Sequence, residues 1–159
     1  MSAALKKKGV ASVAEASVKA NVSVWVRLLE SHNLILGELR HRLAEDCTIA
    51  RFDLLANLER ADGQTLVALS RRMLVTAGNL TGLVDRAERD GMVERKDDPR
   101  DRRVSRVFLT AKGRQLVTAL LPAHAAHVGD LLRGLQPTER RELRRLLGKL
   151  RDSLMGETK

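Results

Sequence analysis

The sequence predicts a mainly helical protein of the α+β class with one small β-hairpin. Apolar residues recur every three or four positions over most of the 159 residues, which is the spacing of one helix face. Two short runs, 92–96 and 104–109, flank a polar loop and predict two strands. Aromatic residues make up only 2% of the chain, so leucine, valine and alanine must fill the core, and this composition favours helices.

The N-terminal part predicts a loose arm followed by one long helix. Residues 1–19 have little apolar periodicity and include three consecutive lysines, so we expect a flexible basic arm. Residues 20–46 have helical spacing and no proline. The apolar stripe of this helix is wider than one neighbouring helix needs, which indicates a subunit interface. The stripe consists of Val22, Trp25, Leu28, Leu29, Leu36, Leu39 and Leu43.

Three shorter helices are predicted next. Thr48 is a suitable N-cap for a helix over residues 49–60, which Asp62 and Gly63 end. A short helix over 66–73 and another over 76–90 follow, and Gly91 ends the latter in a left-handed conformation that costs glycine least. The side chains expected to face inwards are Phe52, Leu55, Leu58, Leu80, Leu83, Val84 and Ala87.

The C-terminal part predicts two further helices after the hairpin. Pro99 keeps the loop over residues 97–103 from continuing a strand. Thr110 caps a helix that Pro122 should kink or break in two, and Thr138 begins the last helix. That helix has one stripe of leucines and an opposite basic face. The stripe comprises Leu143, Leu146, Leu147, Leu150 and Leu154, and the basic face comprises Arg140, Arg141, Arg144, Arg145 and Lys149.

Composition limits the function classes. The formal net charge of +9 favours a polyanionic partner such as nucleic acid. No apolar run is long enough for a membrane span, and the N-terminus is too polar for a signal peptide. The single cysteine, Cys47, cannot form an internal disulfide, which fits a reducing compartment. We therefore expect a soluble cytoplasmic protein without membrane contact.

The order helix, tight turn, helix, strand, charged loop, strand over residues 65–110 predicts a winged helix-turn-helix. In such a unit the second helix enters the major groove of double-stranded DNA while the first braces it. The second helix offers small or hydrogen-bonding side chains that permit close approach to base edges, and arginines nearby can reach phosphates. The candidate contacts are Thr76, Ala77, Gly78, Asn79, Thr81, Gly82, Arg86, Arg71 and Arg72.

The loop between the strands supplies a second set of candidates, Arg100, Asp101, Arg102 and Arg103. An arginine at a hairpin tip gains from the negative potential of a narrow minor groove. Asp101 would oppose phosphates, so we interpret it as a brace that fixes Arg103 through a charge-assisted hydrogen bond.

These segments resemble the signature of the multiple-antibiotic-resistance regulator (MarR) family. The resemblance lies in TGLVDRAERDGMVER at 81–95, DPRDRR at 98–103 and VFLTAKG at 107–113, and it extends over about residues 22–155. It implies that Asp101 and Arg103 form the wing pair and that residues 76–86 hold the base-reading face. Gly82 departs from the family pattern, in which a larger polar or basic side chain is common.

The resemblance also implies a homodimer, because the terminal helices of this family interlock two chains. The predicted organisation is a basic arm at 1–19, a winged helix-turn-helix DNA-binding domain at 48–110, and a helical dimerisation region at 20–47 and 111–159. Two recognition helices about one helical turn apart would read a pseudo-palindrome.

A small-molecule effector is the further implication of the resemblance. Candidate ligand-binding residues are Trp25, His32, Arg40, Arg51 and Phe52, since arginine and histidine near apolar side chains suit an aromatic acid or an acyl-CoA thioester. Cys47 beside Asp46 is unfavourable for a thiolate, and a buried cysteine is the simpler interpretation. His124 and His127 lack the further ligands of a metal site, so we expect no metal. The sequence has no Gly-rich phosphate loop, no nucleophile elbow and no paired carboxylates at catalytic spacing, so we expect no cofactor and no catalysis.

The leading hypothesis is a repressor that such an effector releases from its operator. The alternatives are an architectural DNA-binding protein without an effector, a redox-responsive regulator through Cys47, and a helical protein-interaction module that uses the leucine stripe. A footprint on one palindrome would separate the first two, whereas a dimer that ignores DNA at low salt would support the last.

Overall fold

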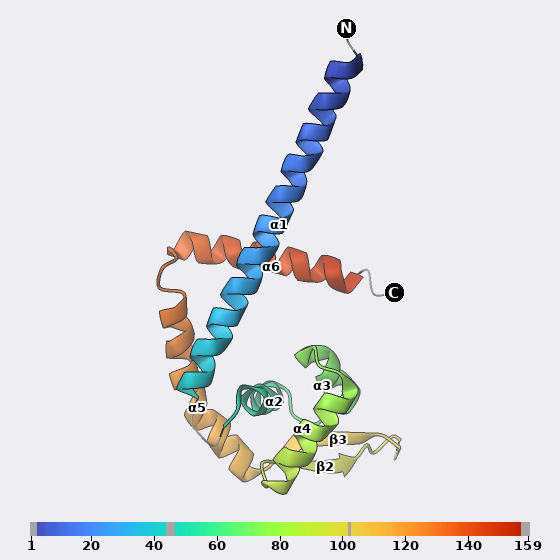
Figure 1. The fold of residues 1–159 in the computed structure, drawn as a ribbon. Helices are drawn as coiled ribbons and strands as arrows, with labels where there is room; N and C mark the ends of the chain where they lie inside the picture. The colour runs from blue at the N-terminus through green and yellow to red at the C-terminus, as the bar shows by residue number, and fades with distance from the viewer. Residues whose placement is uncertain (1–2, 44–46, 102, 157–159) are drawn as a thin grey trace. The chain divides into compact units, whose positions relative to one another are not determined.

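The computed structural model describes residues 3–43, 47–101 and 103–156, with side chains described from residue 17 onward (Figure 1). The chain divides into two units, Met1–Arg42 and Leu43–Lys159. The N-terminal unit is the helix α1 (Ala3–Arg42). The C-terminal unit contains α2 (Ile49–Arg60), β1 (Gln64–Thr65), α3 (Leu66–Met73), α4 (Ala77–Arg89), β2 (Val93–Asp97), β3 (Ser105–Leu109), α5 (Ala111–Leu131) and α6 (Pro137–Gly156). The predicted fold class is confirmed.

Helix α1 is longer than predicted, because residues 3–19, which were expected to form a loose arm, are helical, while residues 1–2 lie outside the described residues. The helix begins at Ala3 and ends at Arg42, whereas the prediction was 20–46, of which 44–46 lie outside the described residues. The stretch before residue 20 is rich in alanine and also contains lysine and glutamate, which are strong helix formers, and it has no proline. Intrinsic propensity therefore extends the helix where no apolar stripe indicated one.

Threonine caps define the helices of the C-terminal unit. The side chains of Thr48, Thr65 and Thr76 accept hydrogen bonds from the backbone N–H three residues later, at 3.2 to 3.3 Å. The predicted ranges 49–60 and 66–73 are confirmed, and α4 begins at Ala77 with Thr76 as its N-cap. Gly91 has a φ of 70°, the predicted left-handed conformation.

The sheet has three antiparallel strands in the order β1-β3-β2. The hairpin pairs Val93 with Leu109 and Asp97 with Ser105, close to the predicted strands. The third strand was not predicted. It is the two-residue β1, in which Gln64 lies opposite Val107. It ties the end of α2 to the hairpin.

One hydrophobic core fills the C-terminal unit. All side chains predicted to face inwards from α2 and α4 are buried, with exposed fractions of 7% or less. Leu69 of α3, Val93 and Val107 of the hairpin, and Val117 of α5 complete this core. It holds α4 and the hairpin in one body.

The last two helices differ in small ways from the prediction. Thr110 caps α5 as predicted, but the helix continues through Pro122 and is not divided there. Helix α6 begins at Pro137, one residue early, because proline suits a first helical position. The Gln136 N–H donates to the Glu139 carboxylate at 2.7 Å and closes this end. No helix in the described ranges is both long and apolar enough to span a membrane.

Candidate nucleic-acid interface

Helices α3 and α4 are joined by a tight turn centred on Leu74. Leu74 has a φ of 55°, a left-handed conformation that is uncommon for a residue with a side chain. The Ser70 hydroxyl donates to the Val75 carbonyl at 2.7 Å, and the Val75 N–H donates to the Ser70 carbonyl at 3.2 Å. These bonds hold the turn of a helix-turn-helix.

The first two turns of α4 present the face predicted to read bases. Thr76, Ala77, Gly78, Asn79 and Thr81 are all exposed, while the opposite side of the helix is in the core. The Thr81 hydroxyl donates to the Ala77 carbonyl at 2.9 Å. Thr81 therefore offers an outside partner its oxygen lone pair and its methyl group.

Gly78 and Gly82 leave this face shallow. A Cβ atom at Gly78 would meet no atom within 4 Å, and one at Gly82 would lie 3.5 Å from Nη1 of Arg86. A hollow of about 350 Å³ lies here, lined by Ala50, Val75, Gly78, Asn79, Gly82, Leu83 and Arg86. The departure from the family pattern at Gly82 thus gives the Arg86 guanidinium room to lie along the helix.

Basic side chains flank this face on both helices. Arg71 and Arg72 lie exposed in the last turn of α3, and Arg86 lies exposed in the last turn of α4. Their positions fit contacts to phosphates on either side of a groove.

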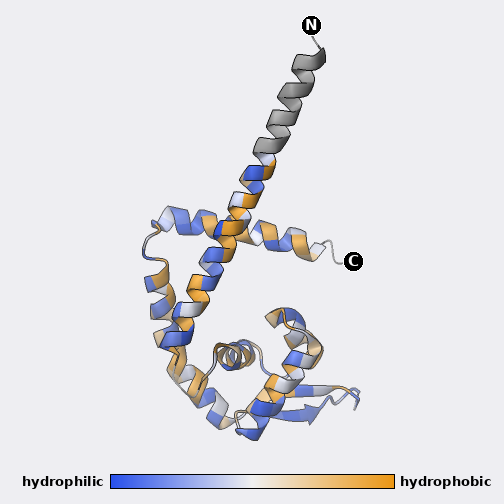
Figure 2. Ribbon diagram, in the orientation of Figure 1, coloured by the Kyte–Doolittle hydropathy of each residue, from blue (hydrophilic) through white to orange (hydrophobic). Residues whose placement is uncertain are grey.

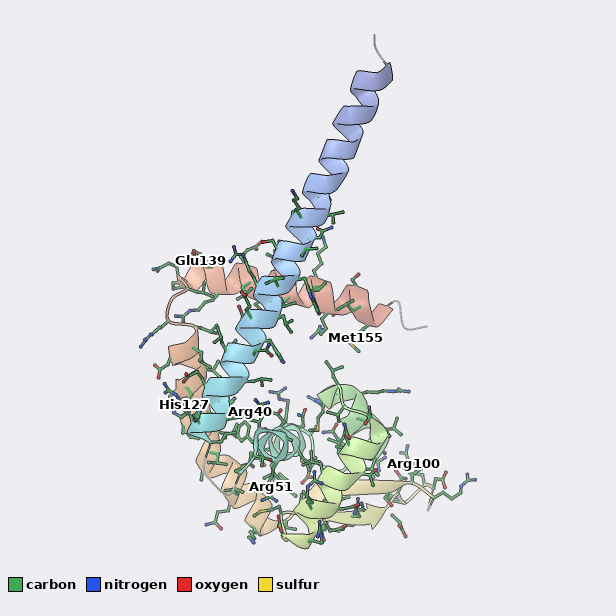
Figure 3. The ribbon with its side chains drawn as sticks, viewed as in Figure 1. Arg40, Arg51, Arg100, His127, Glu139 and Met155 are labelled. Carbon is green, nitrogen blue, oxygen red and sulfur yellow. The ribbon has the colours of Figure 1, made fainter. Side chains whose placement is uncertain are left out.

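The wing carries the predicted brace. The Asp101 carboxylate accepts from Nε and Nη2 of Arg103 at 3.1 and 3.2 Å and from the Arg103 N–H at 3.0 Å. The Arg103 side chain is 90% exposed. The bonds from Arg103 lower the pKa of Asp101, so the brace persists at neutral pH and is lost on acidification. Arg100 lies near the tip of the hairpin (Figure 3), and Arg102 lies outside the described residues.

A second ion pair at the base of the wing was not predicted. The buried Asp98 carboxylate accepts from Nε of Arg106 and, at 2.8 Å, from the Arg100 N–H, while Nη1 of Arg106 donates to the Gly63 carbonyl at 2.8 Å. The backbone bond from Arg100, followed by the bond from Arg106, lowers the pKa of Asp98. Sequence reasoning treated Asp98 as one charge of a polar loop, because the partner comes from β3.

A third cluster joins the wing to α4. Arg95 of β2 donates to the carboxylates of Asp85 and Glu88, and its N–H donates to Glu88 at 3.0 Å. Asp85 and Glu88 lie on α4 beside the proposed reading face. Arg95 therefore couples the orientation of the hairpin to that of the helix, which no sequence signal indicated.

The connection between the wing and α5 is unusually close. The carbonyl oxygen of Met92 would lie 2.0 Å from a Cβ atom at Gly113, so only glycine fits there. The same oxygen accepts from the Thr110 N–H at 3.1 Å, and the Thr110 hydroxyl donates to the Gly91 carbonyl at 2.7 Å. This cluster, which we call the Gly113 junction, joins the end of α4, both strands of the hairpin and the start of α5.

The predicted ligand residues separate into two groups. Trp25, His32 and Arg40 are exposed on α1, in the N-terminal unit. Arg51 and Phe52 lie on α2. Arg51, labelled in Figure 3, lies on the side of α2 near α4 and forms an ion pair with Asp90 at the end of that helix. Phe52 is 3% exposed, and its ring lies 4.4 Å from that of His124. Phe52 is thus a core side chain of this structure, and its assignment as a ligand contact stays a prediction.

Cys47 lies in the core. It is 3% exposed, and burial raises the pKa of its thiol, which opposes formation of a reactive thiolate. The redox alternative therefore has no support from its surroundings. Among the described side chains, no group of three histidine, cysteine or carboxylate residues could hold a metal ion.

The comparisons with known proteins place this architecture in one family. The model of the MarR family matches residues 46–104, which contain α2 to α4 and the first part of the wing. The transcriptional activatory protein BadR of Rhodopseudomonas palustris is 34% identical over 135 residues, which cover 80% of this chain and 77% of BadR. The chain belongs to the MarR family. The regulator YkoM of Bacillus subtilis is 35% identical over 98 residues, or 62% of this chain and 64% of that protein.

Solved MarR-type structures share the fold. A cysteine-to-serine variant of MarR from E. coli in complex with operator DNA has a TM-score of 0.76 at 26% identity, covering 82% of this chain and 95% of that one. BpsR of Bordetella bronchiseptica, whose DNA binding 6-hydroxynicotinic acid regulates, has a TM-score of 0.75 at 25% identity, covering 80% and 98%. Members of this family regulate transcription and are not enzymes.

Replacing Arg103 with alanine in this MarR-type chain should weaken DNA binding by about 1–3 kcal/mol per wing, because an exposed guanidinium is lost from the hairpin. A gel-shift titration measures the change, and Arg133→Ala, an exposed arginine beyond α5, is the matched control. Equal affinities of Arg103→Ala and the wild type would contradict the assignment of the wing.

Replacing Asn79 with alanine should change the base preference of the protein and leave the structure of α4 intact. The Asn79 amide is exposed and can form a pair of bonds with a base edge, worth roughly 1–3 kcal/mol. Selection from a random duplex library measures the preference, with Gln115→Ala as an exposed amide control on α5. An unchanged base profile would exclude Asn79 from base reading.

Proposed function

We propose that the chain is a homodimeric transcriptional repressor that binds a pseudo-palindromic operator and is released by a small anionic effector. The observation that carries this proposal is the exposed leucine stripe of α6, in a chain whose helix-turn-helix already has a complete core of its own. One such unit reads one half-site, so a second copy supplies the other half.

The stripe is too apolar to stay in water. Leu143, Leu146, Leu147, Leu150 and Leu154 are 39% to 60% exposed, and no residue of α6 is buried. Figure 2 shows the apolar positions alternating with polar ones along α6. Burying one leucine fully is worth about 1.5–3 kcal/mol, so five of them on one face are a strong drive to association.

Helix α1 carries a second exposed apolar surface. Val22, Trp25 and Leu29 lie at helical spacing and are 54%, 60% and 44% exposed. Val24 and Leu28 extend this surface around the helix, so it is wider than a single neighbouring helix covers. A partner subunit that covers both α1 and α6 would remove these side chains from water.

The effector that we propose is an aromatic acid or an acyl-CoA thioester. The support is the 6-hydroxynicotinic acid that regulates BpsR, together with exposed basic side chains on α1, His32 and Arg40. Such a ligand can lower DNA affinity only by its preference for the dimer conformation that does not bind the operator. BadR is named an activatory protein, so the direction of regulation requires a transcription measurement.

The first experiment tests assembly and DNA binding together. Light scattering should give twice the 17.6 kDa of one chain, and the emission of Trp25, the only tryptophan, should shift to shorter wavelength as the chains associate. A footprint should protect one palindrome with half-sites about one helical turn apart. A monomer, or equal competition by random duplex, would refute the proposal.

The second experiment tests the effector. Aromatic acids and their CoA thioesters are screened for release of the protein from its own upstream DNA, and transcription from that DNA is measured in their presence. We expect release by one chemical class and increased transcription. If none of these compounds releases the protein from DNA, an architectural DNA-binding protein without an effector becomes the better account.

A further inference from the structure

Helix α6 has a second face, opposite the leucine stripe, that the proposed dimer does not use. The helix contains six basic side chains against three acidic ones. Arg141, Arg145 and Asp152 project about half a turn away from Leu146 and Leu150, with Arg144 and Lys149 at their sides. A partner that packs on the leucine stripe alone leaves this basic face exposed, as it is in the single chain. We define it as Arg141, Arg144, Arg145 and Lys149.

The acidic side chains of α6 neutralise only part of this face. Glu142 accepts from Nε and Nη2 of Arg145 at 2.8 and 2.7 Å, and Asp152 accepts from Nη2 of Arg151 at 2.7 Å. In the part of the chain that the structure describes, no carboxylate lies within ion-pair distance of Arg141, Arg144 or Lys149. Three exposed cations therefore remain within about 12 Å along the helix.

Gly148 leaves a notch between these cations. A Cβ atom there would meet nothing within 4 Å, and an open hollow of about 630 Å³ lies over the glycine, lined by the four basic residues and Asp152. The basic side chains can therefore approach one anionic group from both sides. This arrangement suits the phosphates of a nucleic-acid backbone, which present negative charge repeatedly along a line.

We infer that the basic face of α6 binds the backbone of a second DNA duplex, so that one dimer bridges two DNA segments. This inference rests on the proposed dimer. Helix α5 has 21 residues and is therefore about 31 Å long, and it separates the hairpin, which ends where α5 begins, from α6, which follows the end of α5 (Figure 1). The DNA that α4 and the wing hold is therefore a different segment from the one that α6 contacts.

The choice of DNA follows from chemistry on the same helix. A membrane-surface helix would need its leucine stripe for lipid, but the stripe is taken by the partner subunit, and α6 has no aromatic side chain. A regulator bound to its operator is surrounded by other duplex segments at high local concentration. The contact carries no base information, because arginine and lysine bind phosphates regardless of sequence.

The test captures a second duplex on the intact protein. Biotinylated operator on beads is saturated with full-length protein, and a fluorescent duplex of random sequence is added at about 50 mM and about 200 mM salt. The test variant is Arg141→Gln with Arg144→Gln and Lys149→Gln. The control is Arg27→Gln with Arg60→Gln and Arg133→Gln, which removes the same charge from exposed arginines elsewhere.

We expect the wild type and the control to capture the second duplex at the lower salt and to release most of it at the higher salt. The α6 variant should capture at least tenfold less while binding the operator as tightly as the wild type. Its salt dependence of binding to random duplex should also fall by about 0.9 per lost phosphate contact.

Three results would overturn the inference. They are equal capture of the second duplex by the α6 variant and the wild type, a loss of capture in the control as large as that in the α6 variant, and stronger capture of fluorescent polyglutamate, added to a parallel sample, than of duplex. The last result would indicate an acidic protein partner. Beads that retain no protein would instead show that operator binding fails. In that case the salt dependence of binding to random duplex is measured alone. A smaller salt dependence in the α6 variant than in the control supports the inference, and equal values overturn it.

Discussion

Gly113→Ala is expected to lower the free energy of unfolding by about 3 kcal/mol, the upper end of what overpacking costs in a well-packed site. The added methyl group would lie 2.0 Å from the Met92 carbonyl oxygen and 3.3 Å from Cδ2 of Leu109. The nearest obstacle is backbone, so no rotamer change can relieve it. Either α5 or the start of the hairpin must move.

The movement would break bonds as well as contacts. The Met92 oxygen accepts from Thr110, and the N–H of Gly113 itself donates to the Thr110 hydroxyl at 3.1 Å. These bonds cap α5 and close the end of the sheet. The loss therefore reaches both elements, and we expect DNA binding to weaken along with stability.

Urea denaturation followed by circular dichroism measures the effect. Gly129→Ala is the matched control, because it lies on the same helix, is exposed and would meet no atom within 4 Å. That substitution should leave stability unchanged or raise it by up to about 1 kcal/mol through helix propensity. An unfolding midpoint of Gly113→Ala equal to that of the wild type would show that the junction adapts.

Leu146→Glu combined with Leu150→Glu is expected to convert the proposed dimer into a folded monomer and to lower operator affinity by on the order of 100-fold or more. Both leucines lie at the centre of the α6 stripe, 48% and 43% exposed in the single chain. The chain alone can carry glutamate there at little cost. In a dimer the same carboxylates would lose their water without a partner charge.

Light scattering and gel-shift titration of the same preparations measure the two effects. Leu146→Met with Leu150→Met is the control, since methionine keeps the volume and apolar character of the stripe. It should remain dimeric and bind as the wild type does. A glutamate variant that stays dimeric, with unchanged far-ultraviolet circular dichroism, would place the subunit interface elsewhere.

Local signals explain why most of the C-terminal unit could be predicted. Thr48, Thr76 and Thr110 precede apolar periodic stretches, and each accepts the backbone hydrogen bond of an N-cap. Gly91 follows α4 and takes the left-handed conformation that only glycine adopts without strain. Each of these signals involves residues within four positions of one another, so the sequence contains them directly.

Features that depend on distant partners escaped prediction. The two-residue strand β1 has no periodicity of its own and exists because Gln64 and Thr65 lie against β3. The start of α1 was not predicted for another reason. Its helix propensity is high but its apolar pattern is weak, so apolar periodicity alone does not indicate a helix there.

The candidate DNA interface shows the same division. Asp101 and Arg103 are two residues apart, so their pairing could be predicted from charge and spacing. The partners of Arg95 lie seven and ten residues away on another element, and Arg106 reaches the Gly63 carbonyl 43 positions away. Only the folded sheet brings these groups together.

The tie that Arg95 makes from β2 to Asp85 and Glu88 has a consequence for how a ligand could act. It leaves little freedom for α4 and its hairpin to tilt against each other, so each subunit would contact DNA as one rigid unit. In the proposed dimer, the distance between the two α4 helices is therefore the quantity that remains free to change. An effector would then weaken operator binding by holding the two α4 helices at a distance that differs from the spacing of successive major grooves.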